Sequence, residues 1–357
     1  MNMALFHPLR WSWLTTALFT LMIGVMAATL ALPTSAEPPM KTYRILMVLW
    51  RGEEDAVQGF RDYFATQRIP VSIMVRDAAG DLAKLPGLLK EAKAIRPDLV
   101  VTWGTSVTLA LLGPYDAADP NPYLPAAGIP GIFMIVSQPV ESRIVPALAS
   151  SGRNITGTAY LVPEETQLRA ARSYFDFDKI GIVYNDKEDN ARLSVEALRA
   201  LAPTLGYTLI ERPLPLDRKG NPRADLIEPL VAEIAAAGAQ LLYQPPDSFL
   251  NVNRDRLTQA ALARGLPTLA AGENPVRNSY ALMGIINRYY TVGQLTAYKA
   301  RQILVEGLNP KEIPIEAPKR FSFMINLPVA LQLGRYPPMN LLKFAEIIEG
   351  DTDIRRP

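Results

Sequence analysis

Polar and aromatic side chains follow the ends of apolar runs at several points of this 357-residue chain. The candidate binding residues are Trp50, Arg51, Thr105, Ser106, Ser137 and Gln138 in the N-terminal half, and Asn185, Asp247, Ser248 and Glu273 in the C-terminal half. Helix N-terminal N–H groups at Thr105 and Ser106 suit a carboxylate, and the carboxylate of Asp247 or Glu273 suits an ammonium group. The set therefore favours binding of a small zwitterion.

Each of these residues also has a purely structural interpretation. Asp247 and Ser248 can cap the helix that follows them, and Glu273 opens a Glu-Asn-Pro sequence that is typical of a turn. Trp50 can pack in the core or at its rim, and Arg51 can be a solvated loop charge. The prediction of a binding site rests on the repeated pattern at strand ends, not on any single residue.

The segment from residue 96 to residue 112 shows this pattern most clearly. The β-branched, uncharged run from Leu99 to Trp103 predicts a strand that is buried on both faces. Gly104 permits a sharp turn, and Thr105 or Ser106 can cap the helix that begins at once. In open α/β sheets ligands bind beyond the carboxyl ends of the strands, where the positive end of a helix dipole attracts anions.

Strands and helices alternate twice along the chain, which predicts two α/β lobes with parallel sheets flanked by helices. The segment after Ile285 can return to the first lobe, which periodicity alone does not show, and such crossings between the lobes would form a hinge. We expect the first lobe at residues 41–158 plus about 287–317, and the second at 159–286 plus about 318–336. Residues 337–357 form a predicted C-terminal tail, with a helix over 339–349. A short helix is expected to end near Ser150. A long helix is expected to begin at Tyr290, and the ring of either Tyr289 or Tyr290 can reach the cleft.

The composition excludes several classes of chemistry. The chain has no cysteine, and its single histidine is His7, so the remaining residues cannot supply Ser-His-Asp or Cys-His catalysis or the usual zinc ligands. No glycine-rich phosphate-binding pattern follows any predicted strand. We therefore expect no metal, no cofactor and no enzymatic activity, although a carboxylate-based hydrolase stays a minor alternative. The net charge of +2 does not indicate a nucleic-acid partner.

The N-terminus has the features of a secretory signal. One basic residue, Arg10, precedes an apolar run from Trp11 to Leu32, and the small residues Thr34-Ser35-Ala36 follow. This pattern predicts a signal peptide over residues 1–36 and a soluble, exported mature protein. The apolar run is also long enough to cross a bilayer, so an uncleaved anchor is the alternative.

Several segments of the chain resemble a known family, the ABC-transporter substrate-binding proteins of the tryptophan/tyrosine-binding type. The similar segments occur in family order and include Pro97-Asp98-Leu99-Val100-Val101, Gly152-Arg153-Asn154-Ile155-Thr156-Gly157 and Asn287-Arg288-Tyr289-Tyr290. The resemblance covers about Lys41 to Tyr336 and implies the type I periplasmic binding fold. By match to the family's ligand-facing turns it assigns binding roles to Thr105, Ser106, Asn185 and Asp247, and more loosely to Ser137 and Gln138.

The resemblance implies capture of a small solute, most simply an amino acid or related carboxylate, and delivery of that solute to an ABC permease in the inner membrane. We expect the protein itself to be a monomer. An aromatic amino acid is favoured by the family and by nearby rings such as Trp50 and Tyr290. One departure is Gln138-Pro139, where the family usually has aspartate-proline. The alternative function is ligand sensing for a membrane receptor, which the extra tail and the long loop after Gly113 would suit.

Overall fold

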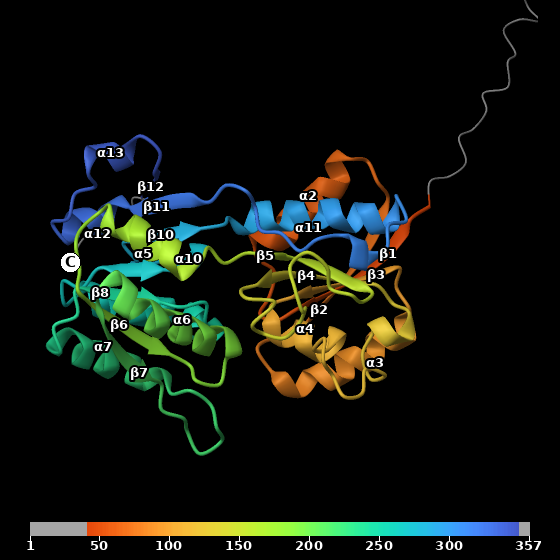
Figure 1. The fold of residues 1–357 in the computed structure, drawn as a ribbon, viewed down its shortest axis with the longest axis horizontal. Helices are drawn as coiled ribbons and strands as arrows, with labels where there is room; N and C mark the ends of the chain where they lie inside the picture. Colours follow the sequence, from red (N-terminus) through yellow and green to blue (C-terminus); the bar gives the residue numbers. More distant parts are fainter. Residues whose placement is uncertain (1–40, 350–357) are drawn as a thin grey trace, which may run out of the picture. The chain divides into compact units, whose positions relative to one another are not determined.

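The computed structural model describes residues 41–349, and the predicted signal peptide lies outside them. The first sheet has five parallel strands in the order β2-β1-β3-β4-β5 (Figure 1). Their bounds are β1 Tyr43–Leu49, β2 Val71–Asp77, β3 Leu99–Trp103, β4 Gly131–Val136 and β5 Ile155–Ala159. Because β1, β3 and β4 are inner strands covered on both faces, they are nearly continuous apolar runs, as predicted.

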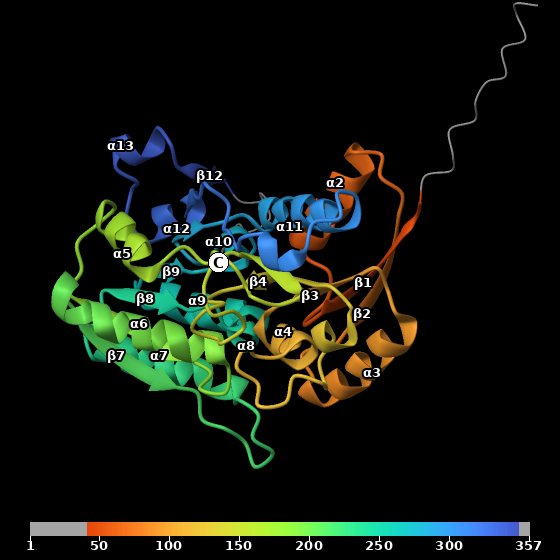
Figure 2. The ribbon, with the colours of Figure 1, turned by 45° about the vertical axis from the view of Figure 1, so that its right-hand side comes forward.

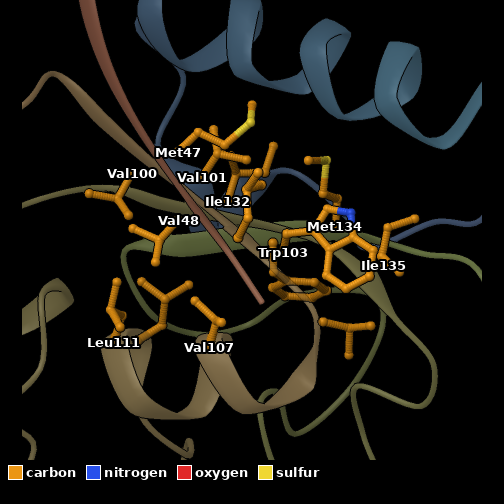
Figure 3. Packing of buried hydrophobic residues seen from close by; sticks show 14 of the residues in the cluster. Met47, Val48, Val100, Val101, Trp103, Val107, Leu111, Ile132, Met134 and Ile135 are labelled. Carbon is orange, nitrogen blue, oxygen red and sulfur yellow. The ribbon is translucent and has the colours of Figure 1, made fainter. Parts of the chain in front are cut away.

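The helices of the first sheet come from both ends of the described chain. Their bounds are α2 Asp55–Thr66, α3 Leu85–Ile95, α4 Thr105–Leu112 and α11 Tyr289–Leu304, with short 3₁₀ turns η1 Leu82–Lys84 and η2 Pro125–Ala127. Helix α11 packs against α2 although more than 200 residues separate them, as the neighbouring ribbons in Figures 1 and 2 show. On the other face, Val107 and Leu111 of α4 pack below Val48 and Val100 (Figure 3).

Glycines allow α2 and α11 to approach closely. A Cβ atom on Gly59 would lie 2.1 Å from the carbonyl oxygen of Tyr290, and one on Gly293 would lie 2.0 Å from that of Ala56. Since real side chains essentially never come so close to backbone atoms, only glycine fits at these two points. The chain after β10 therefore returns to the first sheet.

The second sheet has seven strands in the order β12-β11-β10-β9-β8-β6-β7. Their bounds are β6 Lys179–Tyr184, β7 Thr208–Pro213, β8 Leu241–Gln244, β9 Thr268–Ala270, β10 Met283–Ile286, β11 Ser322–Asn326 and β12 Glu346–Ile348. The associated helices are α5 Glu164–Arg172, α6 Asp189–Leu205, α7 Ile227–Ala236, α8 Ser248–Val252, α9 Arg254–Leu262, α10 Glu273–Arg277, α12 Leu327–Gln332 and α13 Met339–Leu342, with 3₁₀ turns η3 Ala224–Leu226 and η4 Pro310–Glu312. Both sheets belong to one unit that begins at Thr42.

Several expectations need correction. Strand β11 runs antiparallel to β10, so the second sheet is not wholly parallel. No helix ends near Ser150, because residues 137–150 form successive turns. Part of the predicted helical tail is strand β12, which pairs with β11, and only Met339–Leu342 is helical. The apolar pair Ile347-Ile348 in β12 shows why the sheet extends this far.

Three chain segments connect the two sheets, after β5, after β10 and after α11. The buried ammonium group of Lys299 on α11 joins strand β5 to the segment after α11, because it donates to the carbonyl oxygen of Gly157 at 3.1 Å and to that of Pro314. The same ammonium lies 3.3 Å from the carboxylate of Glu316. Burial lowers the pKa of Lys299, and the carboxylate of Glu316 opposes this shift.

Candidate functional site

A cavity lies where the strand ends of the first sheet meet those of the second. Seven of the ten predicted binding residues line it, namely Trp50, Arg51, Thr105, Ser106, Ser137, Asp247 and Ser248. The first five follow strands β1, β3 and β4, and the last two follow β8. Residues from both sheets therefore form one site, in the crevice where open α/β sheets bind ligands.

Arg51 is the cation of this cavity and is held on three sides. Its Nε donates to Glu54 Oε1 at 3.0 Å, and its Nη1 donates to Ser248 Oγ at 3.0 Å. Its guanidinium carbon lies 4.7 Å from the ring centroid of Trp103, in cation–π contact. Only 12% of the side chain is exposed, which excludes the interpretation as a solvated loop charge.

The charge of Arg51 is retained in spite of its burial. Burial acts to lower the pKa of the guanidinium, but the adjacent carboxylate of Glu54 more than compensates, so the pKa lies above its ordinary value. Among the described residues, Nη2 makes no hydrogen bond. A fixed positive group with unused N–H donors therefore lines the cavity, which is a suitable arrangement for binding a carboxylate.

The N-terminus of α4 lies next to Arg51. Gly104 is its N-cap and has a φ of +88°, a backbone conformation that residues with a side chain rarely adopt. The expected side-chain cap by Thr105 or Ser106 is wrong, because the helix begins at Thr105 and has no side-chain cap. The first N–H groups of α4 have no partner within the helix, so Thr105 and Ser106 place backbone donors at the cavity.

Two carboxyl groups, those of Asp247 and Glu188, line the opposite side. Asp247 Oδ1 accepts from the backbone N–H of Leu250 at 2.9 Å and Oδ2 from that of Asn185 at 2.7 Å. Asp247 is thus the N-cap of α8, as its structural interpretation predicted. Glu188 Oε2 accepts from the backbone N–H of Ser248 at 2.5 Å. Burial, then repulsion from Glu188, raises the pKa of Asp247 well above its ordinary value.

The structure places the other three predicted residues outside the cavity lining. Gln138 donates from Nε2 to Glu164 Oε1 at 3.1 Å. Asn185 accepts from the backbone N–H of Lys187 at 3.1 Å, so it supports Asp247 only through its own backbone. Glu273 is buried at the start of α10, where it accepts from the N–H of Tyr289 at 3.0 Å, and so its sequence begins a helix instead of a turn.

Several lining residues were not singled out as binding residues in the sequence. These are Trp103, Gly104, Ile135, Tyr160, Glu188, Asn190, Gln244, Pro245, Pro246, Asn251, Gly272 and Pro275. The sequence could have indicated Trp103 and Gln244, because each is the last residue of a strand, β3 or β8, immediately before a turn. Of the two neighbouring tyrosines, Tyr289 lines the cavity, whereas the Tyr290 hydroxyl donates to Asp62 at 3.0 Å.

Ile135 is in an unusual backbone conformation beside the cavity. Its φ is +54°, which is rare for a β-branched residue. The register between β4 and β5 shifts between Phe133 and Val136, so one extra residue is accommodated there as a bulge. Figure 3 shows Ile135 beside Trp103 at the end of the sheet. Bulges next to binding sites redirect side chains, and this one places Ile135 and Ser137 on the cavity wall.

Within residues 41–349 no cluster of three or more histidine, cysteine, aspartate or glutamate side chains could hold a metal ion. In the same range no helix combines the length and apolar character that a membrane crossing needs.

Residues 51–348 match the family of ABC transporter substrate binding proteins. A relative named tyrosine-binding protein, from Clostridioides difficile, is 28% identical over 203 residues, which are 56% of this chain and 55% of the relative. The match thus spans about half the length of that relative.

Solved structures show the same fold. A conserved domain protein from Vibrio cholerae has a TM-score of 0.73 at 22% identity, over 86% of this chain and 99% of that one. An ABC domain in complex with L-Trp from Streptococcus pneumonia has a TM-score of 0.71 at 21% identity, over 85% of this chain and 99% of that one. The predicted two-sheet periplasmic-binding fold is confirmed. This chain belongs to the family of ABC transporter substrate binding proteins, which is a family of binding components and not of enzymes.

Proposed function

We propose that the protein is exported to the periplasm, binds an amino acid as a monomer, and delivers it to an ABC permease in the inner membrane. The predicted signal peptide over residues 1–36 supports export. The single observation that carries the choice of ligand is the placement of a cation and of a pair of carboxyl groups on opposite sides of one cavity. Arg51 and the N-terminus of α4 lie on the side of the first sheet, and Glu188 and Asp247 lie on the side of the second.

These two sides suit the two ends of a zwitterion. The ligand carboxylate would accept from Arg51 Nη2 and from the first N–H groups of α4. The ammonium group would donate to the carboxyl pair of Glu188 and Asp247. A micromolar dissociation constant requires about −8 kcal/mol, and one hydrogen bond to a charged group supplies roughly 1.5–3 kcal/mol, so several such contacts and some apolar burial are needed.

Aromatic rings supply the apolar surface. Trp50, Trp103, Tyr160 and Tyr289 line the cavity, and the rings of Tyr160 and Tyr289 meet edge to face with centroids 5.7 Å apart. This lining favours an aromatic amino acid. The names of two similar proteins, a tyrosine-binding protein and a complex with L-Trp, support the same ligand class.

Closure of two lobes would complete the site. We infer that residues 41–158 with about 287–317 form one lobe. Residues 159–286 with about 318–348, which include β12, form the other. The three connecting segments would serve as the hinge, and the ligand would stabilise the closed arrangement because it contacts both lobes.

Mass spectrometry of the purified protein, followed by a thermal-shift panel of amino acids, tests the proposal. A ligand at 100 times its Kd should stabilise the fold by about 2.7 kcal/mol, which a melting curve detects. A co-purified aromatic amino acid with a matching shift is the expected result. A protein that carries no amino acid and responds to none in the panel would contradict the proposed ligand class.

A further inference from the structure

A group of large apolar side chains is exposed near the C-terminal end of the described chain. We define the C-terminal patch as Phe321, Tyr336, Met339, Leu342 and Phe344, whose exposed fractions are 51, 68, 82, 45 and 66%. Single exposed apolar residues are normal on protein surfaces, but these five, together with Leu331 (51%), fall within 24 residues and are a concentration. Figures 1 and 2 both show α13, which carries Met339 and Leu342, projecting beyond α12 and β12.

The local structure holds these side chains outward. Leu341 is buried and attaches α13 to the second sheet, while Met339 and Leu342, three residues apart, share the opposite, exposed face. The backbone N–H of Leu341 donates to the carbonyl oxygen of Pro338 at 2.9 Å, and that of Ala345 to Leu341 at 2.8 Å. The segment is therefore an ordered turn that presents apolar groups.

The strand register brings the two ends of the patch together. Strands β11 and β12 are parallel, with Met324 opposite Glu346, so Phe321 and Phe344 lie near the same ends of neighbouring strands. The rings of Phe323 and Phe344 have centroids 6.5 Å apart, which fixes Phe344 at this end of the sheet.

The charge of the surrounding sequence is one-sided. Residues 317–345 contain four basic side chains, those of Lys319, Arg320, Arg335 and Lys343, and no acidic one. The acidic residues on either side, Glu316 and Glu346, form ion pairs with Lys299 and with Arg277 and Arg288. Lys319, Arg320 and Lys343 are exposed. Aromatic and aliphatic side chains beside lysine and arginine are the composition of surfaces that lie in the headgroup region of anionic bilayers.

We propose that the C-terminal patch is a membrane-contact surface that inserts its apolar side chains into the headgroup region of an anionic phospholipid bilayer. Charge complementarity with the basic residues selects lipid over a second copy of the chain, whose patch would carry the same positive charge. The contact would keep the binding protein near the membrane that holds its transporter, and it is independent of the identity of the solute.

Vesicle sedimentation tests this surface. All described strands and helices lie after residue 42, so a chain that starts at Glu37 keeps the whole fold without the apolar N-terminal run. Vesicles of phosphatidylcholine with one quarter phosphatidylglycerol should sediment this protein. The double variant Met339→Ser with Phe344→Ser should bind about tenfold more weakly, and Lys343→Gln about threefold more weakly, with high salt reducing binding of all forms.

The control is Leu82→Ser, which removes an apolar side chain of similar exposure to Phe344 (63% against 66%) from the part of the chain around the first sheet. It should leave vesicle binding unchanged. Equal binding by the double variant and the parent protein, or no binding to anionic vesicles, would overturn the proposal. So would a concentration-dependent dimer in sedimentation velocity that the double variant abolishes, since the patch would then bind a second copy. Unchanged melting curves for each variant exclude misfolding as the cause.

Discussion

Arg51 Nη1 donates a hydrogen bond of 3.0 Å to Ser248 Oγ. Arg51 follows strand β1 of the first sheet, and Ser248 begins helix α8 after strand β8 of the second. The same guanidinium lies on Trp103 and pairs with Glu54. One buried cation therefore both lines the cavity and connects its two sides. In the proposed mechanism, the contact that orients Arg51 for the ligand forms only when the two sides are close together.

Replacement of Arg51 by lysine tests its role. Arg51→Lys keeps a positive charge but loses the planar set of donors that reaches Glu54, Ser248 and the ligand. Loss of one hydrogen bond to a charged group costs about 1.5–3 kcal/mol, so Kd should rise about tenfold or more. Ser248→Ala removes only the contact across the cavity and should raise Kd about twofold to fivefold. Calorimetry with the co-purified solute measures both. An unchanged Kd in Arg51→Lys would remove Arg51 from the binding site.

Asp247→Asn distinguishes a ligand contact from a cap. An amide cannot accept both backbone N–H groups that the carboxylate accepts now, so the fold should lose about 1–3 kcal/mol. If Asp247 also meets an ammonium group, Kd should rise tenfold or more. Glu188→Gln is the companion variant, because its remaining oxygen can still accept from Ser248. A lower melting temperature with unchanged affinity would leave Asp247 with a capping role alone.

The fold could be predicted well from local patterns. Buried runs such as Leu99–Trp103 and Ile180–Tyr184 have the composition of inner parallel strands, and the turn residues after them mark the strand ends that form the cavity. Because parallel strands end on the same side of a sheet, these signals place Arg51 and Thr105 at one edge of the first sheet. They place Asp247 at the corresponding edge of the second sheet.

Other parts of the site depend on tertiary structure and have no local signal. Nothing in the sequence around Ile135 indicates a bulge with positive φ, because the extra residue is defined only by pairing with β5. Glu273 looks like a ligand-facing carboxylate, yet it accepts from the N–H of Tyr289, sixteen residues away. Strand β12 is three residues long and becomes a strand only by pairing with β11.

Gly293→Ala tests the return of α11 to the first sheet. The new Cβ atom would lie 2.0 Å from the carbonyl oxygen of Ala56, so α2 and α11 must move apart. Overpacking of this kind costs about 1–3 kcal/mol, and chemical denaturation should show a loss in that range or above it. Gly87→Ala is the comparison, because Gly87 lies in α3 at an open position where no atom lies within 4 Å of a new Cβ and φ is not positive. Equal stability of Gly293→Ala and the parent protein would contradict the close helix contact.

The buried carboxyl group of Glu164 should make stability depend on pH. Its Oε1 accepts from Ser194 Oγ at 2.6 Å and from Gln138 Nε2 at 3.1 Å, and burial raises its pKa above the ordinary value. Because the folded state holds this proton more tightly than the unfolded state, the stabilisation is complete below about pH 4.5 and is lost as the pH rises through the folded pKa. Glu164→Gln keeps an oxygen for both hydrogen bonds and has no charge to bury.

The Glu164→Gln variant should therefore melt close to the parent protein at low pH and above it at pH 8. Glu165→Gln, at the exposed neighbouring position of α5, controls for the loss of one negative charge on the same helix. Melting curves of the three proteins across the acid and neutral range measure the effect. If Glu164→Gln were less stable than the parent protein at pH 8, the ionised carboxylate would be the form that the Gln138 and Ser194 contacts stabilise, and the departure from aspartate at position 138 would serve to hold that charge.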